Sequence, residues 1–91
     1  MCYMYILRCS NGQYYVGSTY DLDKRLAEHQ CGEGALFTKN HLPVELVYYE
    51  QFQQIDEAFR REHQVKGWNR EKKEALINKH PELLPELSKH K

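Results

Sequence analysis

Apolar residues occur along the chain in short runs that switch between the period of a strand and that of a helix. An aromatic-rich apolar run covers residues 2–9 and ends at Ser10-Asn11-Gly12, and a second run follows from Gln13. Two such runs around a turn sequence predict a β-hairpin. A third run over residues 45–52, rich in β-branched and aromatic residues, predicts another strand.

The hairpin has two possible turns, and each gives a different register. With a two-residue Asn11-Gly12 loop, Tyr5 and Tyr15 point to opposite faces of the sheet. With a three-residue loop that ends in a Gly12 bulge, Tyr5, Tyr15 and Gly17 share one face. A slip of one residue moves every side chain to the other face, so the turn decides which residues can form one site.

Helical patterns follow the hairpin and the third strand. Three polar residues stand where helix caps are expected: Asp21 before residues 22–30, Asp56 before a helix to about Lys66, and Asn69 before one that stops at Pro81. Residues 31–43 hold two glycines and a proline and predict a long surface loop. Strands that precede helices predict an α+β domain, a small three-stranded antiparallel sheet flanked by helices.

Length and composition allow one small core. The chain has 91 residues, of which 41% are hydrophobic and 29% charged, which excludes collagen-like, low-complexity and wholly disordered classes. We expect one domain over residues 1–80 and a C-terminal tail over residues 81–91, where two prolines precede a polar end.

Charge and cysteine content limit the remaining classes. The 13 Lys and Arg residues balance the 13 Asp and Glu residues, so a phosphate site must be a local patch. Cys2, Cys9 and Cys31 cannot all pair within one chain and lack the CxxC spacing of zinc or redox sites. No apolar run approaches the roughly 18 residues of a membrane span. We expect a cytoplasmic protein with reduced thiols and no membrane partner, a monomer by default.

One carboxylate departs from the helical pattern. Glu62 falls in the middle of the stripe expected to face the core, which consists of Ala58, Phe59 and Val65. Because an unpaired buried charge is costly, Glu62 either pairs with a nearby Arg60 or Arg61 or holds a cation at a cleft. A hard cation such as Mg²⁺ accepts one carboxylate together with waters and phosphate oxygens.

Gly17 is the residue of the hairpin that strand packing does not explain. Aromatic residues favour strands and pack across them, which explains the four tyrosines of the hairpin. Glycine weakens a strand and normally marks a bulge or a close approach. In the three-residue register Gly17 faces Tyr5, which leaves a notch beside two phenols that could admit a phosphodiester.

Basic side chains add candidate phosphate contacts. Arg25 and His29 lie four residues apart and, taken alone, are explained by a solvated helix face. Arginine nevertheless suits bidentate phosphate contacts, and a neutral histidine can relay a proton near neutral pH. Lys39 and His41, in the predicted loop, are further candidates for phosphate binding.

Taken in order, four groups of these residues resemble the GIY-YIG nuclease superfamily: Met4-Tyr5-Ile6, Tyr15-Val16-Gly17-Ser18, Arg25 with His29, and Glu62. The resemblance covers roughly residues 2–78. It is strongest to small single-domain, YhbQ-like members, which are grouped with the amino-terminal nuclease domain of excinuclease ABC. It implies the GIY-YIG endonuclease fold and a metal-dependent DNA endonuclease active in DNA repair or processing.

The resemblance also implies roles for single residues. Tyr5 and Tyr15 would deprotonate the attacking water and orient it or the phosphate, in an order left open. Arg25 would neutralise the scissile phosphate, His29 would assist the base or hold the substrate, and Glu62 would bind the one divalent metal, Mg²⁺ or Mn²⁺. Substrate contacts are expected from Gly17, Ser18, Lys39 and His41. Since both tyrosines must reach one site, the resemblance selects the three-residue turn.

Three departures from the family pattern limit this transfer. Tyr3 and Met4 stand where the family name has Gly and Ile, and Ser18 stands where the excinuclease domain has a lysine that assists catalysis. The late asparagine of the family has no secure match, because Asn69 is better explained as a helix cap. The expected substrate is DNA, single-stranded or branched forms included, with a possible partner protein. The alternatives are a non-catalytic nucleic-acid-binding module on the same fold and a protein-interaction domain.

Overall fold

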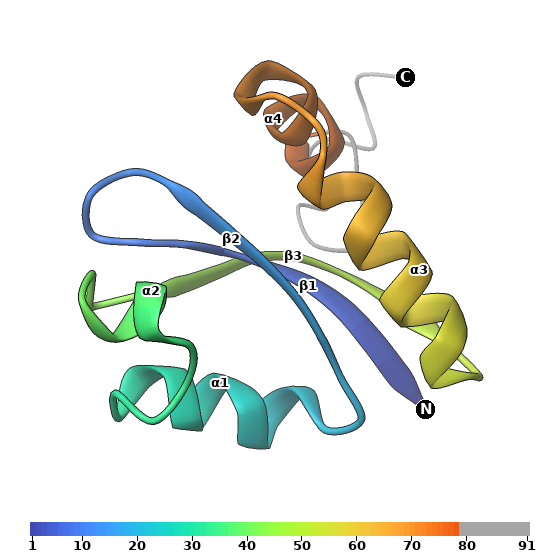
Figure 1. Ribbon diagram of the computed structural model, residues 1–91, viewed down its shortest axis with the longest axis horizontal. Helices are drawn as coiled ribbons and strands as arrows, with labels where there is room; N and C mark the ends of the chain where they lie inside the picture. Colours follow the sequence, from blue (N-terminus) through green and yellow to red (C-terminus); the bar gives the residue numbers. More distant parts are fainter. Residues whose placement is uncertain (79–91) are drawn as a thin grey trace.

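A three-stranded antiparallel sheet with helices on both faces forms the core of the molecule, as the computed structural model shows (Figure 1). The structure describes residues 1–78. The strands are β1 (Cys2–Arg8), β2 (Tyr14–Thr19) and β3 (Glu45–Phe52), in the order β2-β1-β3. The helices are α1 (Leu22–Gln30), α2 (Leu36–Lys39), α3 (Ile55–Lys66) and α4 (Arg70–Asn78). The predicted α+β class and three-stranded antiparallel sheet are confirmed.

The hairpin between β1 and β2 has the three-residue turn. The Cys9 amide donates to the Gln13 carbonyl at 2.8 Å, and the Gly12 amide donates to the Cys9 carbonyl at 2.8 Å. Gly12 has a φ of 86°, the left-handed conformation that glycine adopts without strain. In this register Tyr5 lies opposite Gly17. The expected register is therefore confirmed.

β1 is the central strand, and both of its faces are covered. Figure 1 shows α1 and α2 on one side of the sheet and α3 and α4 on the other. Met4 and Ile6 pack with Val65 on the α3 side. Tyr5 and Leu7 belong to the cluster on the α1 side. A strand covered on both faces requires an uninterrupted apolar run, which the sequence over residues 2–9 provides.

Two of the three predicted helix caps are confirmed. The Asp21 carboxylate accepts the Lys24 amide at 3.1 Å, and the Asn69 side chain accepts the Lys72 amide at 2.9 Å. These bonds satisfy amides that have no partner within the first helical turn. Both helices therefore begin where the sequence placed them.

The cap of α3 was predicted wrongly. The helix begins at Ile55, so Asp56 lies inside its first turn and Gln54 is the cap residue. The Glu57 carboxylate reaches back to accept the Gln54 amide at 3.2 Å. Asp56 instead places negative charge near the positive end of the helix dipole, which is favourable there.

The segment 31–43 is more ordered than the predicted loop. It contains the single helical turn α2, and the Leu42–Pro43 peptide bond is cis. The predicted helix end at Pro81, the domain boundary at residue 80 and the tail over residues 81–91 lie outside the described residues.

All three cysteines lie in the described part of the chain and are free thiols, as predicted. Cys2 and Cys9 are buried, and Cys31 is exposed. No helix within residues 1–78 combines the length and the apolar character needed to cross a bilayer.

Candidate active site

Three aromatic rings meet beneath the hairpin. The ring centroids of Tyr5 and Tyr15 lie 6.4 Å apart, and those of Tyr15 and His29 lie 5.2 Å apart. The centroids of Tyr5 and His29 lie 5.8 Å apart. The register places both tyrosines on the face of the sheet that α1 covers, and α1 carries His29. Two phenols and an imidazole therefore share one site.

His29 is a buried residue, in contrast to the solvated helix face that its spacing from Arg25 suggested. Its side chain is fully enclosed, and its ring nitrogens contact two hydroxyls. Nε2 lies 2.9 Å from the Tyr5 hydroxyl, and Nδ1 lies 2.8 Å from the Thr38 hydroxyl. Burial, and to a smaller extent the nearby Arg25 charge, lowers the pKa of His29 to about 4. The imidazole is thus neutral at pH 7.

The Tyr5 phenol is protonated at rest. Burial raises the pKa of Tyr5 to about 12, against a smaller lowering by the guanidinium of Arg25. Arg25 also forms an ion pair with Glu28 at 2.9 Å. One cation on α1 therefore acts on the phenol and is held in place by a carboxylate of the same helix.

The missing side chain of Gly17 is what makes room for the Tyr5 hydroxyl. A Cβ atom built on Gly17 would lie 2.5 Å from the Tyr5 hydroxyl oxygen, closer than real Cβ contacts allow. Tyr5 and Gly17 are direct cross-strand partners. The notch inferred from the sequence is filled by the Tyr5 hydroxyl, and a phosphodiester would meet this hydroxyl at the open edge of β2.

Glu62 reaches the site from α3, on the other face of the sheet. The Ser18 hydroxyl donates to one carboxylate oxygen at 2.6 Å, and the Lys66 ammonium donates to the other at 2.8 Å. The expected ion pair with Arg60 or Arg61 is wrong. Arg61 pairs with Glu50 at 2.9 Å, on the side of α3 that faces β3.

The two halves of the site meet across β2, which is an edge strand. The negative charge of Glu62 raises the pKa of Tyr5, and the Tyr15 phenol contributes to the raised pKa of Lys66 after the larger effect of the Glu62 hydrogen bond. We expected Arg25 and Glu62 to line one cleft. Both lie near enough to Tyr5 to act on its phenol, from helices on opposite faces of the sheet (Figure 1).

Comparison with known proteins identifies the family. The model of the GIY-YIG catalytic domain matches residues 1–75 of this chain. The chain belongs to the GIY-YIG family. This membership indicates a nuclease-type function with a nucleic-acid substrate, and GIY-YIG nucleases typically use divalent metal ions.

The relatives of this GIY-YIG domain are small bacterial and archaeal proteins. A UPF0213 protein of Halobacterium salinarum is 45% identical over 77 residues, which cover 85% of this chain and 100% of that protein. One from Staphylococcus saprophyticus is 43% identical over 76 residues, 84% of this chain and 93% of that protein. The solution NMR structure of a Bacillus halodurans UPF0213 protein has a TM-score of 0.55 and 42% identity, with coverage of 85% and 83%.

The donor set of this GIY-YIG domain fits one hard divalent cation. Within residues 1–78 no group of three or more His, Cys, Asp and Glu side chains could hold a metal ion by itself. Glu62 offers one carboxylate beside the Ser18 hydroxyl, and Mg²⁺ commonly takes one or two carboxylates and fills its other positions with waters and phosphate oxygens. Lys66 occupies one carboxylate oxygen, but its side chain is 52% exposed and free to leave.

Two predicted substrate contacts are not brought to the tyrosines. Within the described residues, no hydrogen bond, ion pair or ring contact joins the side chain of Lys39 or His41 to Tyr5 or Tyr15. The His41 ring instead packs on Phe37, with centroids 4.7 Å apart. A role for Lys39 and His41 in binding DNA stays a prediction.

Two residues of this GIY-YIG domain were missed by the sequence analysis. Lys66 stands four residues after Glu62, the spacing of a helical ion pair, so the pattern could have indicated it. Thr38 gives no such signal. It lies nine residues from His29 in the chain, and only the fold of the intervening segment brings its hydroxyl to the ring.

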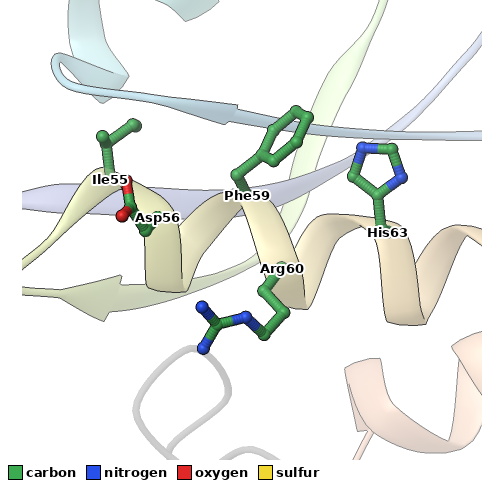
Figure 2. Close-up of a pocket in the computed structure, with 5 residues that line it drawn as sticks. All are labelled: Ile55, Asp56, Phe59, Arg60 and His63. Carbon is green, nitrogen blue, oxygen red and sulfur yellow. The ribbon is translucent and has the colours of Figure 1, made fainter.

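A separate hollow of about 490 Å³ lies on α3 and does not include the tyrosines or Glu62. Its described lining, drawn in Figure 2, consists of Ile55, Asp56, Phe59, Arg60 and His63. Phe59, expected on the inward stripe, is 54% exposed, and its ring packs on His63. Ala58, Glu62 and Val65 face the sheet, and Phe59 lies roughly 100° around the helix from Ala58.

Proposed function

We propose that this protein is a metal-dependent endonuclease that hydrolyses phosphodiester bonds of DNA, in DNA repair or processing. The observation that carries the proposal is the convergence of Tyr5, Tyr15 and His29 next to Glu62 at the edge of β2, in a chain of the GIY-YIG family. Hydrolysis needs an activated water and positive charge on the non-bridging phosphate oxygens, and these residue types can supply both.

Glu62, assisted by the Ser18 hydroxyl, would hold Mg²⁺ or Mn²⁺. When bound, the ion would supply positive charge to the phosphate and favour the ionised form of the nearby Tyr5 phenol. Lys66 would give up its contact with the Glu62 carboxylate at that moment. Arg25, already beside Tyr5, would contribute the second positive charge to the phosphate.

Tyr5 is our choice for the general base. Its hydroxyl lies 2.9 Å from His29 Nε2, so a proton taken from the attacking water can be matched by one passed to the imidazole. Tyr15, which is half-buried in the same site, would orient the water or the phosphate. The sequence leaves this order open, and the hydrogen bond between Tyr5 and His29 supports the choice of Tyr5.

The first test is cleavage of labelled single-stranded, duplex and branched DNA with Mg²⁺ or Mn²⁺. We expect Tyr5→Phe, Arg25→Ala and Glu62→Gln each to lower the cleavage rate about 100-fold or more. Tyr20→Phe, at a phenol that is 69% exposed, and Glu71→Gln on α4 are matched controls that should cleave like the wild type.

The outcomes separate the proposal from the alternatives. Metal-dependent cleavage that the three variants lose supports the nuclease and also reveals the preferred form of DNA. Binding of DNA without cleavage by the wild type would favour a non-catalytic module. Cleavage at the same rate by wild type and Glu62→Gln would contradict the site assignment.

A further inference from the structure

The segment between α1 and α3 closes around the side of His29 that faces away from Tyr5. Thr38 on α2 is fully buried, and its hydroxyl contacts His29 Nδ1 at 2.8 Å. Gly34 approaches from the same segment so closely that an added Cβ atom would collide with the His29 ring. The imidazole is thus held on three sides, by Tyr5, Thr38 and Gly34.

The direction of the hydrogen bond between Thr38 and His29 follows from the other partner of Thr38. The Thr38 hydroxyl donates to the Ala35 carbonyl at 2.9 Å. A carbonyl oxygen can only accept, and a hydroxyl has one proton to donate. Turning that proton toward His29 would leave two oxygen atoms with facing lone pairs at 2.9 Å. The Thr38 hydroxyl therefore accepts from His29, and Nδ1 carries a proton.

The state of the other ring nitrogen follows. A neutral imidazole carries one proton, so a protonated Nδ1 leaves Nε2 as an acceptor. Burial keeps His29 neutral near pH 7, because it lowers the pKa to about 4. Nε2 then accepts the hydroxyl proton of Tyr5 across 2.9 Å. Every hydrogen bond in the chain from Tyr5 to the Ala35 carbonyl has one donor and one acceptor.

We propose that Thr38 is a positioning residue that fixes His29 as the Nδ1-protonated tautomer, so that Nε2 is held ready for the proton of Tyr5. The opposite tautomer would present an N–H to the Tyr5 hydroxyl and could take no proton from it. The tautomer assignment stands on the hydrogen bonds alone. Its catalytic consequence rests on the proposed nuclease function.

The tautomer can be measured directly by NMR of ¹⁵N-labelled protein, without DNA or metal. In the wild type we expect the His29 resonances of a protonated Nδ1 and an unprotonated Nε2. Thr38→Ser keeps the hydroxyl and should give the same pattern. Thr38→Val replaces the hydroxyl by a methyl group that cannot accept, and should shift His29 toward the Nε2-protonated tautomer or a mixture.

An Nε2-protonated His29 in the wild type would overturn the proposal, and so would an unchanged Nδ1-protonated ring in Thr38→Val. If Thr38→Val does not fold, the wild-type spectrum and Thr38→Ser still decide the assignment.

Cleavage is the second readout. We expect Thr38→Val to lower kcat about tenfold or more with little change in DNA affinity, and Thr38→Ser to restore most of the rate. Wild-type cleavage in Thr38→Val would refute the positioning role. If the wild type shows the expected tautomer but cleaves no DNA, the proposed function fails while the tautomer assignment stands.

Discussion

Single atoms decide whether the two tyrosines of this GIY-YIG domain share a site. Gly17 lies opposite Tyr5 and has no Cβ, so the Tyr5 hydroxyl can occupy the space beside the backbone of β2. The Gly12 bulge in the turn sets the register that makes them partners. A side chain at position 17 would displace the hydroxyl on which the proposed chemistry depends.

We predict that Gly17→Ala destabilises the protein by about 1–3 kcal/mol, because the new methyl group overlaps the Tyr5 hydroxyl. Urea unfolding measures the change, and the loss of the Tyr5–His29 contact should also lower cleavage. Gly67→Ala is the matched control. Its Cβ atom would meet nothing nearer than 3.7 Å, and its φ of −81° suits alanine, so its stability should change by less than about 1 kcal/mol. Equal stability of the two variants would refute the close-approach argument.

Among the elements, α3 contributes the acidic half of the site. The inward stripe of Ala58, Glu62 and Val65 follows the helical period, and it brings Glu62 to Ser18 at the edge of β2. Lys66 lies one turn further along and binds the same carboxylate. The ammonium therefore competes with any cation for an oxygen of Glu62.

We predict that Lys66→Met tightens Mn²⁺ binding by about twofold to fivefold, since the competing ammonium, an exposed ion pair worth a fraction of a kcal/mol to about 1 kcal/mol, is removed. Titration followed by electron paramagnetic resonance measures the affinity. Lys24→Met on α1 removes the same charge elsewhere and should leave the affinity nearly unchanged. Weaker or unaltered Mn²⁺ binding by Lys66→Met would show that Lys66 does not compete.

For the molecule as a whole, the enclosed His29 couples stability to pH. The unfolded chain takes up a proton on this histidine near pH 6.5, whereas the folded protein does so only near pH 4. Between these values the unfolded state binds more protons, so folding becomes less favourable as the pH falls. The folded state thus requires the same neutral imidazole that the proposed proton transfer uses.

We predict that the free energy of unfolding falls by about 3 kcal/mol on this account as the pH drops from 6.5 to 4, at about 1.4 kcal/mol per pKa unit. Urea unfolding at a series of pH values measures it. His29→Gln cannot take up the proton and should show a flatter dependence over the same range. Parallel curves for the two proteins would mean that His29 is not the group responsible.

Local patterns in the sequence determined the elements of this fold. The apolar run of β1, the turn residues before Gln13, and the caps Asp21 and Asn69 act through neighbours in the chain, so their structures could be predicted. The cap of α3 and the outward Phe59 were missed because the helix begins one residue earlier and its inward stripe is narrower than assumed. The candidate tyrosines, Arg25 and Glu62 were found from motif order rather than from contacts.

The contacts that make a site were decided only by the tertiary structure. His29 is buried because α1, α2 and the hairpin close over it, and no pattern around residue 29 records this. The same holds for Thr38, and for Ser18 as the partner of Glu62, since these pairs come from segments that the chain brings together only on folding. Short-range order is determined by residues a few positions apart, whereas protonation states and hydrogen-bond directions depend on groups that meet when the sheet is covered on both faces.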